Sequence, residues 1–571
     1  MGFVQDAPRL SNTWRSDRAL QEHLGRVLPD DVLAEVSPQL DALGAEAAGG
    51  LADLAAQAEA EAPTLVRFDA WGHRVDRIAA SPAWAALHAH QVRLGLCAIP
   101  YERRFGAHAR VVQHALLHLY GPSSATYTCP VAMTDAAVRV LTDHAEPALR
   151  DRIVPRLISR DVTTAWTSGQ WMTERPGGSD VGRTETVARC GDGGRWRLRG
   201  IKWFTSATTA DCALALARPS PGPARPGAAG SAGLGLFLVE LVDPATGAAQ
   251  VGRTILVNRL KDKLGTRSLP TAELTLDGAV ATPIALEGGL RAISGMLNVT
   301  RVHNAISAAG GMRRAVDLAA DYARRREAFG ARLIDLPLHR QTLADLAVEA
   351  EAAFALTLEV TRLLGRAEAG EADDAERACL RLLTPIAKLQ TGKDAVAVAS
   401  EALECIGGAG YIEDTGLPAL LRNAQVLPIW EGTTNVLALD VLRVASRQPD
   451  ALPALLAHIT ARLTGADVPA LAGAARQVAQ ARDALRAAAG AWAAAGEDEV
   501  QAGMRMFAMR LGRACAAALL IGHAANRLAK HGDHRAAAVA RRYAGRWLAP
   551  PSLGSPGDLA ESLALVTPDG V

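Results

Sequence analysis

The chain lacks several features by which protein classes are recognised. Its seven cysteines form no C-x-x-C pair and stand far apart, which argues against a zinc knuckle and against a disulfide framework. It contains no apolar run long enough to cross a membrane, and it does not begin with the basic-then-apolar pattern of a signal peptide. We therefore expect a reduced, cytoplasmic protein that neither crosses a membrane nor is secreted.

Aromatic residues and excess charge are also scarce. Aromatic side chains make up 4% of the chain and alanine is abundant, which favours helices over sheets. The formal net charge of +1 identifies no partner. Apolar residues at 49% and charged residues at 21% are the proportions of a folded protein, and 571 residues exceed what one simple core accommodates. Two or more packed units are expected.

The spacing of apolar residues predicts a chain that is helical, then β-rich, then helical again. An extended stretch at 66–75 turns at Gly72, ahead of helical spacing that lasts to about residue 160. Period-two alternation marks the next part, and its Pro- and Gly-rich insertion at 218–233 is expected to be a mobile loop between two strands. The predicted domains are an N-terminal extension and helical domain (1–160), a β-rich domain (161–285), a helical bundle (286–447) and an extra helical, partly basic domain (448–571).

The sequence SGQWMTERPGGSDVGRTET at 168–186 is the first candidate binding loop. Pro176, Gly177 and Gly178 predict a tight turn that brings backbone N–H groups within reach of a ligand, and Thr173 and Ser179 flank it with hydroxyls. Such neutral donors suit an isoalloxazine edge and a pyrophosphate. Taken alone, the stretch is more typical of a β-turn with hydroxyl caps.

The sequence GIKWFTSA at 200–207 is the second. Trp203 stands two residues before Thr205, which predicts that both side chains lie on one face of a strand. There the indole would cover a flat ring while the hydroxyl hydrogen-bonds to it. A half-buried strand with an aromatic anchor is the simpler interpretation of this stretch alone.

The sequence YARRREAFGARL at 322–333 is the third. Arg324, Arg325 and Arg326 suit the C-terminus of a helix, and Gly330 suits a helix stop. Besides this capping role, Arg326 is placed to meet a phosphate.

The fourth stretch, at 404–444, contains a generic glycine cluster at 407–410 and the sequence PIWEGTTNV. Glu431 lies between Trp430 and Gly432, just ahead of an apolar helical run. A carboxylate beside an aromatic ring loses solvation, and its pKa then rises towards that of a useful base. A glutamate in the first turn of a helix is the ordinary alternative.

In this order and at these separations, the four stretches resemble the acyl-CoA dehydrogenase family over about residues 80–447. MTERPGGSD is similar to the family's flavin loop, KWFT to its second flavin strand, RREAFG to the arginine segment that reaches the FAD of a neighbouring subunit, IGGAGY to its adenine-side loop, and WEGT to the segment with the base glutamate. The resemblance implies a fold that is mainly α with a central β domain: a helical domain, a β-barrel-like domain, a four-helix bundle and, here, an extra helical domain. It also implies FAD, an acyl-CoA or similar acyl thioester as substrate, and a homotetramer.

The resemblance assigns a role to each matching residue. Glu431 would be the base that takes the α-proton of the thioester, and Arg301 is similar to a family arginine close to that base, with a salt bridge inside the bundle as its alternative. Many family members have Asp at the position of Asn298, where it meets coenzyme A, so the usual contact is not expected here. The residues expected at the cofactor are Gln170, Trp171, Met172, Thr173, Gly178, Ser179, Trp203, Phe204, Thr205, Arg326, Phe329, Gly407, Gly408, Thr433 and Asn435.

Segments 68–88 and 258–268 and the long C-terminal tail are similar to the alkylation-response (AidB-like) branch of the family, which is associated with DNA binding. Residues 505–546 contain nine lysines and arginines against one acidic residue, Asp533, and a basic face can bind phosphates without sequence specificity. A solvated helix face, or pairing with acidic residues elsewhere in a tetramer, is the alternative. The candidate DNA-binding residues are Arg505, Arg510, Arg513, Arg527, Lys530, Arg541, Arg542 and Arg546.

Two further interpretations rank lower. His114 and His118 have a metal-ligand spacing, but no third ligand is suitably spaced nearby, so no metal site is predicted. An acyl-CoA oxidase ranks low because ERPGGSD and WEGT are more similar to dehydrogenases. The sequence thus favours an FAD-dependent acyl-CoA dehydrogenase, with a DNA-binding stress-response flavoprotein of residual dehydrogenase activity as the alternative.

Overall fold

The computed structural model describes residues 4–220, 230–548, 561 and 565. Contacts divide the chain into two compact units, each assembled from segments that are far apart in the sequence. Unit 1 comprises Met1–Gly50, Arg103–Pro122 and Arg301–Val571, and unit 2 comprises Leu51–Glu102 and Ser123–Thr300. Residues 221–229, which hold most of the expected mobile loop, lie outside the described residues. Every helix in the described ranges is too short or too polar to cross a membrane.

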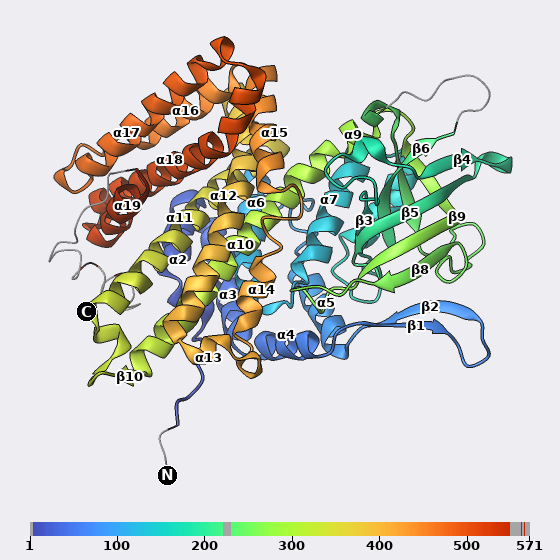
Figure 1. Cartoon of the computed structure of the whole chain (residues 1–571), viewed down its shortest axis with the longest axis horizontal. Coiled ribbons are helices and arrows are strands. Elements are labelled where there is room, and N and C mark those ends of the chain that lie inside the picture. Colours follow the sequence, from blue (N-terminus) through green and yellow to red (C-terminus); the bar gives the residue numbers. More distant parts are fainter. Residues whose placement is uncertain (1–3, 221–229, 549–560, 562–564, 566–571) are drawn as a thin grey trace. The chain divides into compact units, whose positions relative to one another are not determined.

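Unit 1 is helical, as the 3.6-residue spacing predicted (Figure 1). Its longest helices are α10 (Ser294–Arg325, entering this unit at Arg301), α11 (Pro337–Glu368), α12 (Asp374–Ile406) and α18 (Glu497–His531). The helices that precede them in the chain are α1 (Thr13–Ser16), α2 (Arg18–Val27), α3 (Asp30–Ala48) and α6 (Ala109–Tyr120). The remaining elements are the hairpin β10 (Glu327–Ala328) and β11 (Ala331–Arg332), α13 (Gly408–Tyr411), α14 (Pro418–Ala424), α15 (Thr434–Arg447), α16 (Ala451–Arg462), α17 (Pro469–Gly490) and α19 (His534–Leu548).

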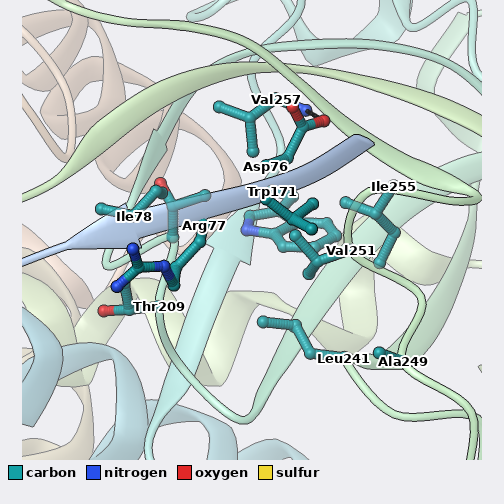
Figure 2. Close-up of a pocket in the computed structure, with 12 residues that line it drawn as sticks. Asp76, Arg77, Ile78, Trp171, Thr209, Leu241, Ala249, Val251, Ile255 and Val257 are labelled. Atoms are coloured by element: carbon teal, nitrogen blue, oxygen red, sulfur yellow. Dashed lines mark hydrogen bonds between the residues drawn. The ribbon is translucent and has the colours of Figure 1, made fainter. Parts of the chain in front are cut away.

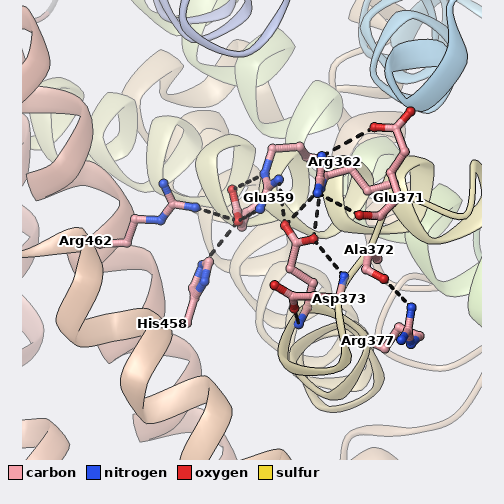
Figure 3. Close-up of polar contacts among 10 residues, drawn as sticks. Glu359, Arg362, Glu371, Ala372, Asp373, Arg377, His458 and Arg462 are labelled. Carbon is pink, nitrogen blue, oxygen red and sulfur yellow. Dashed lines mark hydrogen bonds and ion pairs between the residues drawn. The ribbon is translucent and has the colours of Figure 1, made fainter.

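A buried carboxylate joins the first C-terminal helix to the bundle. Glu359 of α11 accepts hydrogen bonds from Arg362 at 2.9 Å and from Arg462 of α16 at 2.8 Å, and His458 of α16 lies 3.2 Å away (Figure 3). Burial alone would raise the pKa of Glu359, but the contact with His458 and the two arginine charges hold it well below its ordinary value. The extra helical domain is therefore attached through an ionised, internally satisfied group.

Unit 2 contains a barrel-like sheet of seven strands in the order β3-β6-β4-β5-β9-β7, with β8 paired to β9 and with β7 paired again to β6 (Figure 1). This ring of pairings and the helical unit confirm the predicted fold class. The strands are β3 (Ser168–Trp171), β4 (Val187–Cys190), β5 (Trp196–Ser206), β6 (Cys212–Pro219), β7 (Gly235–Glu240), β8 (Ile255–Leu260) and β9 (Thr271–Ala285). The helices are α4 (Gly50–Ala60, all but its first residue in this unit), α5 (Pro82–Leu94), α7 (Thr128–His144), α8 (Pro147–Leu157) and α9 (Gly289–Ala292).

Strand β6 is buried on both faces, and its sequence CALALA shows why. Leu214 and Leu216 pack with residues of α7 and α8, whereas Ala213, Ala215 and Ala217 face the narrow interior of the barrel. Small residues inside and large residues outside let the sheet curve while its outer face forms a core with the helices.

The extended stretch predicted near 66–75 is a hairpin, β1 (Thr64–Phe68) and β2 (Arg74–Ala79), which turns where Gly72 has a φ of +84°. Asp76 fixes it to the barrel, since one carboxylate oxygen accepts a hydrogen bond from the Val257 N–H of β8 at 2.8 Å. The hairpin adds a further layer beside β8.

A buried ion pair fixes the candidate loop at 168–186 to the barrel. The Lys202 ammonium on β5 is fully buried and lies 2.6 Å from Glu174 and 2.7 Å from the carbonyl oxygen of Leu216. Glu174 also accepts hydrogen bonds from the N–H of Glu185 at 2.7 Å and from that of Thr186 at 3.2 Å. Because a buried charge without partners is costly, this arrangement permits one position for the loop.

We expect Lys202→Met to destabilise unit 2 by about 3–5 kcal/mol, because it leaves the Glu174 carboxylate buried without its cation. Denaturant unfolding measures the change. Arg199→Met on the same strand is the matched control: its ion pair with Asp277 is 64% and 56% exposed at the two side chains, so its loss should cost less than about 1 kcal/mol. Equal unfolding midpoints for the two variants would contradict this role of the buried pair.

Candidate active site

The residues predicted for the cofactor and the base fall into two groups, one in each unit. Unit 2 holds those of the loop at 168–186 and of strand β5. Unit 1 holds Glu431 and Arg301 together, Arg326 and Phe329 at the start and turn of the β10–β11 hairpin, and Gly407 and Gly408 at the junction of α12 and α13.

The loop in unit 2 makes the tight turn that its glycines predicted. The N–H of Gly177 donates to the carbonyl oxygen of Glu174 at 3.2 Å, and a Cβ on Gly177 would lie 2.3 Å from the carbonyl oxygen of Asp180. A Cβ on Gly178 would lie 3.2 Å from the Thr173 methyl group. Only glycine permits this close folding, which leaves Gly178 and Ser179 exposed with their polar groups accessible.

The structure brings the loop and strand β5 together. The N–H of Trp203 donates to the carbonyl oxygen of Thr173 at 2.9 Å. On β3, the Oε1 atom of Gln170 is buried and has no hydrogen-bond partner among the described residues. An unsatisfied buried acceptor costs free energy unless a ligand or water donates to it, so this strand suits a ligand that carries N–H or O–H groups.

The expectation that Trp203 and Thr205 share one face of the strand is wrong. The pairing of β5 with β9 moves from Lys202↔Leu274 to Thr205↔Ala272, so β5 has one extra residue at this point. This β-bulge turns both Lys202 and Thr205 towards the interior of the barrel and leaves the half-buried Trp203 on its outer face. The Thr205 hydroxyl donates to the carbonyl oxygen of Ala272 at 2.8 Å, so towards a cofactor it presents only an acceptor.

Two cations lie beside the exposed aromatic residues of the bulge. The Lys261 ammonium is 3.6 Å from the centre of the Trp203 ring and 4.7 Å from that of Phe204, and the Arg175 guanidinium is 5.5 Å from the Trp203 ring. All three contacts are within cation–π range. The surroundings of Trp203 therefore favour a planar, electron-rich or anionic ligand.

The Trp171 side chain lies on the opposite side of β3 from Gln170, by strand alternation. It is 1% exposed and forms one wall of an apolar cavity of about 270 Å³ between hairpin β2 and strands β7 and β8 (Figure 2). Val75, Leu241 and Val251 line the other walls. Trp171 was predicted to bind the cofactor. Its indole lines this apolar cavity instead, so only its backbone is available for that role.

In unit 1, Glu431 lies in a turn-rich segment at residues 425–433, which we call the Glu431 loop. Two residues in it have left-handed backbone angles, Glu431 with a φ of +56° and Gly432 with a φ of +106°. A glutamate in this conformation costs on the order of 1–3 kcal/mol and persists only when its surroundings hold it there. Such strain is typical of functional turns, and it contradicts the alternative of an ordinary first-turn helix glutamate, because α15 begins only at Thr434.

Side chains of two helices hold the Glu431 loop by its carbonyl oxygens. From α10, Arg301 Nε lies 3.4 Å from the Glu431 oxygen and Asn304 Nδ2 lies 3.3 Å from the Leu427 oxygen. From α12, Lys388 Nζ lies 2.6 Å from the Gly432 oxygen. A hydrogen bond from a charged donor contributes about 1.5–3 kcal/mol, enough to offset the backbone strain.

Gly392 lies one helical turn after Lys388 and allows this approach. A Cβ at this position would be 3.0 Å from the Leu427 carbonyl oxygen and 3.2 Å from the Pro428 nitrogen. The face of α12 that meets the Glu431 loop therefore combines a residue without a side chain and a residue with a long cationic one.

Arg301 is itself fixed by a carboxylate. Its guanidinium lies 2.7 Å from Asp440 of α15, which also accepts from Arg443 at 3.1 Å and from Arg381 at 3.4 Å. Burial alone would raise the pKa of Asp440, but the surrounding arginines, Arg301 first, lower it below its ordinary value. The salt bridge weighed as the alternative for Arg301 is thus present, together with its contact to the Glu431 backbone.

The other predicted residues of unit 1 lie at exposed turns. Phe329 is 96% exposed at the tip of the β10–β11 hairpin, where its φ is +55° and that of Gly330 is +80°. Gly330 thus turns a hairpin, and α10 ends earlier, at Arg325. A Cβ on Gly407 or Gly408 would meet nothing within 4 Å, so the backbone there is open to a large ligand.

Thr433 and Asn435 lie at the N-terminus of α15. Thr433 is the N-cap residue but its side chain makes no capping hydrogen bond, and Asn435 accepts from Arg505 of α18 at 2.8 Å. The open N–H groups of the first turn suit an acceptor on a ligand.

Most of the candidate DNA-binding cations are already paired inside unit 1. Arg513 is 6% exposed and lies 2.6 Å from Asp394 and 2.9 Å from Glu349. Four more form ion pairs within the same unit, namely Arg527 with Glu22 and Asp533, Arg541 with Glu561, and Arg542 and Arg546 with Asp345. Pairing across a tetramer stays a prediction. For the exposed Arg510 and Lys530, no ion pair with a described residue is found.

His114 and His118 each have a polar partner within unit 1. His114 Nδ1 lies 2.8 Å from the carbonyl oxygen of Arg110, and His118 Nε2 lies 3.1 Å from Asp17.

Elsewhere in the described part of the chain, buried His23, His523 and Glu351 come within 4.8 Å of one another by their possible ligand atoms. The two imidazoles stack at 3.9 Å with an angle of 14°, and Glu351 accepts from Arg535 at 2.8 Å. A metal must lie in the plane of each ligating ring, which parallel stacked rings do not allow, so this cluster fits a metal poorly.

The chain matches family models along nearly all of its length. Residues 169–279 match the acyl-CoA dehydrogenase middle domain and 287–446 the acyl-CoA dehydrogenase C-terminal domain. Residues 6–162 match the N-terminal domain of the adaptive response protein AidB, and 450–553 match the C-terminal domain-like model of acyl-CoA dehydrogenase 11.

Individual proteins agree with these models. Acyl-CoA dehydrogenase family member 11 of Caenorhabditis elegans is 47% identical over 459 residues, which cover 79% of this chain and 73% of that protein. The putative acyl-CoA dehydrogenase AidB of Escherichia coli (strain K12) is 35% identical over 457 residues, 77% of this chain and 79% of that protein. The crystal structure of C. elegans ACDH-11 in complex with C11-CoA is similar at a TM-score of 0.92 and 41% identity, covering 96% of this chain and 94% of that one. The resemblance seen in the sequence is confirmed: the chain belongs to the acyl-CoA dehydrogenase family of FAD-dependent oxidoreductases, as a member of its AidB-like branch.

Proposed function

We propose that the protein removes hydrogen from the α- and β-carbons of an acyl-CoA, with Glu431 as the base. The observation that carries the proposal is the Glu431 loop, in which a strained glutamate is held by cationic side chains from two helices. A base must stand in one place to take a proton from carbon, because misplacement by about 1 Å lowers the rate steeply.

The chemistry divides between the chain and its cofactor. An α C–H is a weak acid, so the Glu431 carboxylate must accept the proton while the thioester carbonyl is polarised by a donor. The backbone N–H of Glu431 is the donor that the chain offers beside its own base. Bound FAD supplies the acceptor for the β-hydrogen, which leaves as hydride.

Several features fit FAD. The unsatisfied Gln170 acceptor, the exposed polar groups of Gly178 and Ser179 and the cation-flanked Trp203 suit a flavin ring and phosphates in unit 2. We propose that Met172, Thr173, Phe204 and Thr205 line the ring and that Gly407, Gly408, Thr433 and Asn435 meet the remainder of the nucleotide.

We further propose a homotetramer in which the hairpin at Arg326 and Phe329 reaches the FAD of a neighbouring subunit. Phe329 supports this proposal. Its apolar side chain is 96% exposed, and it lies in a two-residue turn in which Gly330 has a left-handed backbone. A rigid, exposed aromatic residue of this kind suits an interface contact.

For the substrate, we propose a medium- or long-chain acyl-CoA, in line with the C11-CoA in the complex of the C. elegans protein. Asn298 replaces the aspartate of many family members, so the coenzyme A contact at this point is uncharged in this chain.

Anaerobic mixing with acyl-CoAs of short, medium and long chains tests the proposal. At least one chain length should bleach the flavin absorbance. No bleaching by any member of the panel would contradict the proposed dehydrogenation.

We expect Glu431→Gln to keep its FAD but to slow bleaching by about 10²–10⁴-fold, the usual contribution of general base catalysis. Glu401→Gln, at an exposed position of α12, is the control and should bleach at the wild-type rate. Bleaching by Glu431→Gln at the wild-type rate would show that the base lies elsewhere.

Duplex-DNA binding with residual dehydrogenase activity ranks second. The name of the E. coli relative, a putative acyl-CoA dehydrogenase, supports dehydrogenation, and the ion pairs inside unit 1 neutralise five of the eight candidate cations. A surface that keeps only a few unpaired cations releases few counterions from DNA.

We therefore expect no salt-dependent mobility shift of duplex DNA by the full chain. A shift that decreases in an Arg510→Ala, Lys530→Ala double variant would instead favour the DNA-binding alternative, because these exposed cations have no paired carboxylate among the described residues.

A further inference from the structure

Lys388 is a buried cation in the middle of α12. Its side chain is fully buried, and its ammonium donates to the Gly432 carbonyl oxygen at 2.6 Å. Lysine is almost never fully buried unless a partner compensates its charge. Among the described residues, no carboxylate forms an ion pair with Lys388 at contact distance, so the carbonyl is its direct partner.

The Glu431 carboxylate, next in sequence to Gly432, compensates the charge of Lys388. Burial, and secondarily the Arg301 charge, lowers the pKa of Lys388 to about 7, while the Glu431 carboxylate acts in the opposite direction and supports the charged ammonium. The two side chains are therefore coupled: each favours the ionised form of the other.

Three arginines near the Glu431 loop share one carboxylate. Arg301 of α10, Arg381 of α12 and Arg443 of α15 all converge on Asp440 of α15. One carboxylate cannot balance three arginines, so Arg301 and Lys388 both bring positive charge to the Glu431 loop, each through a contact with a backbone carbonyl.

We propose that Lys388 is a positioning residue for the base: its ammonium fixes the Gly432 carbonyl and places a positive charge beside the Glu431 carboxylate, which keeps that carboxylate ionised. The inference rests on the proposed function, in which Glu431 takes the α-proton. It assigns to α12 the task of supporting the base, in addition to packing in the bundle.

The sign of the pH effect follows from the charge. A positive charge lowers the pKa of a neighbouring carboxyl group, so removing it raises the pKa of Glu431 and the base becomes protonated at higher pH. Lys388 exerts this effect while it is itself charged, which is below about pH 7. The advantage of Lys388 should therefore be greatest in acidic solution and decrease above that pH.

The test is the pH profile of anaerobic flavin bleaching by an acyl-CoA from the active part of the panel. In Lys388→Gln, which keeps a hydrogen-bond donor without the charge, the acidic limb should move to higher pH by about one unit or more. Lys388→Met, which removes both, should show the same movement and a lower maximal rate. Lys388→Arg, which restores the charge, should return the limb towards its wild-type position.

Lys393→Met on the same helix is the matched control, because this half-buried lysine is not among the groups that contact the Glu431 loop. FAD content, measured by absorbance of the purified proteins, shows whether each variant retains the cofactor. If Lys388→Met does not fold, Lys388→Gln and Lys388→Arg decide the question.

Acidic limbs that superimpose for wild type, Lys388→Gln and Lys388→Arg would overturn the role of Lys388. If Glu431→Gln still blocked bleaching, the proposed function would stand. Wild-type bleaching by Glu431→Gln would overturn both.

Discussion

The hydrogen bonds from α10 and α12 to the carbonyl oxygens of the Glu431 loop are the constraint on which the site in unit 1 depends. Glu431 and Gly432 adopt left-handed backbone angles, which occur in neither a regular helix nor an extended strand. Without Arg301 and Lys388 the loop would lose the donors that offset this strain. Gly392 makes the contact sterically possible, since any side chain there would meet the Leu427 carbonyl.

In unit 2, too, a buried cation orders the backbone of a loop, here through an ion pair. The Lys202–Glu174 ion pair lies inside the barrel, and the same carboxylate accepts from the backbone of the loop that carries Thr173 and Ser179. The bulge on β5 then separates two tasks: Lys202 and Thr205 turn inward to bind the barrel, and Trp203 and Phe204 turn outward. In both units a buried cation orders the backbone beside residues that are proposed to meet the cofactor or substrate.

Periodicity predicted the elements well because it reports burial directly. The helical bundle predicted at 286–447 contains α10, α11 and α12, and the alternating part at 161–285 contains all the strands of the barrel-like sheet. The motifs identified the family because its chemistry requires particular residue types in a fixed order along the chain. The four-domain division remains a prediction, while the compact units combine N-terminal and C-terminal segments, which no local pattern reveals.

What the sequence did not predict depends on contacts between distant residues. A bulge adds one residue to a strand, and the pattern of apolar and polar residues in a short stretch does not reveal it. The face of β5 on which Thr205 lies was therefore mispredicted. Lys388 is a single lysine in an apolar helix, and nothing local indicates that it meets residue 432. The basic tail looked like an open cationic surface because its carboxylate partners, Glu349 and Asp394 for Arg513, lie on other helices.

In the proposed reaction, Glu431 removes the α-proton as part of the step that reduces the flavin. Flavin bleaching measured anaerobically with an acyl-CoA carrying deuterium at the α-carbon tests it most directly. If Glu431 breaks that bond during reduction, deuterium should slow bleaching several-fold relative to the unlabelled substrate. Equal rates for the two substrates, with bleaching otherwise intact, would contradict the account.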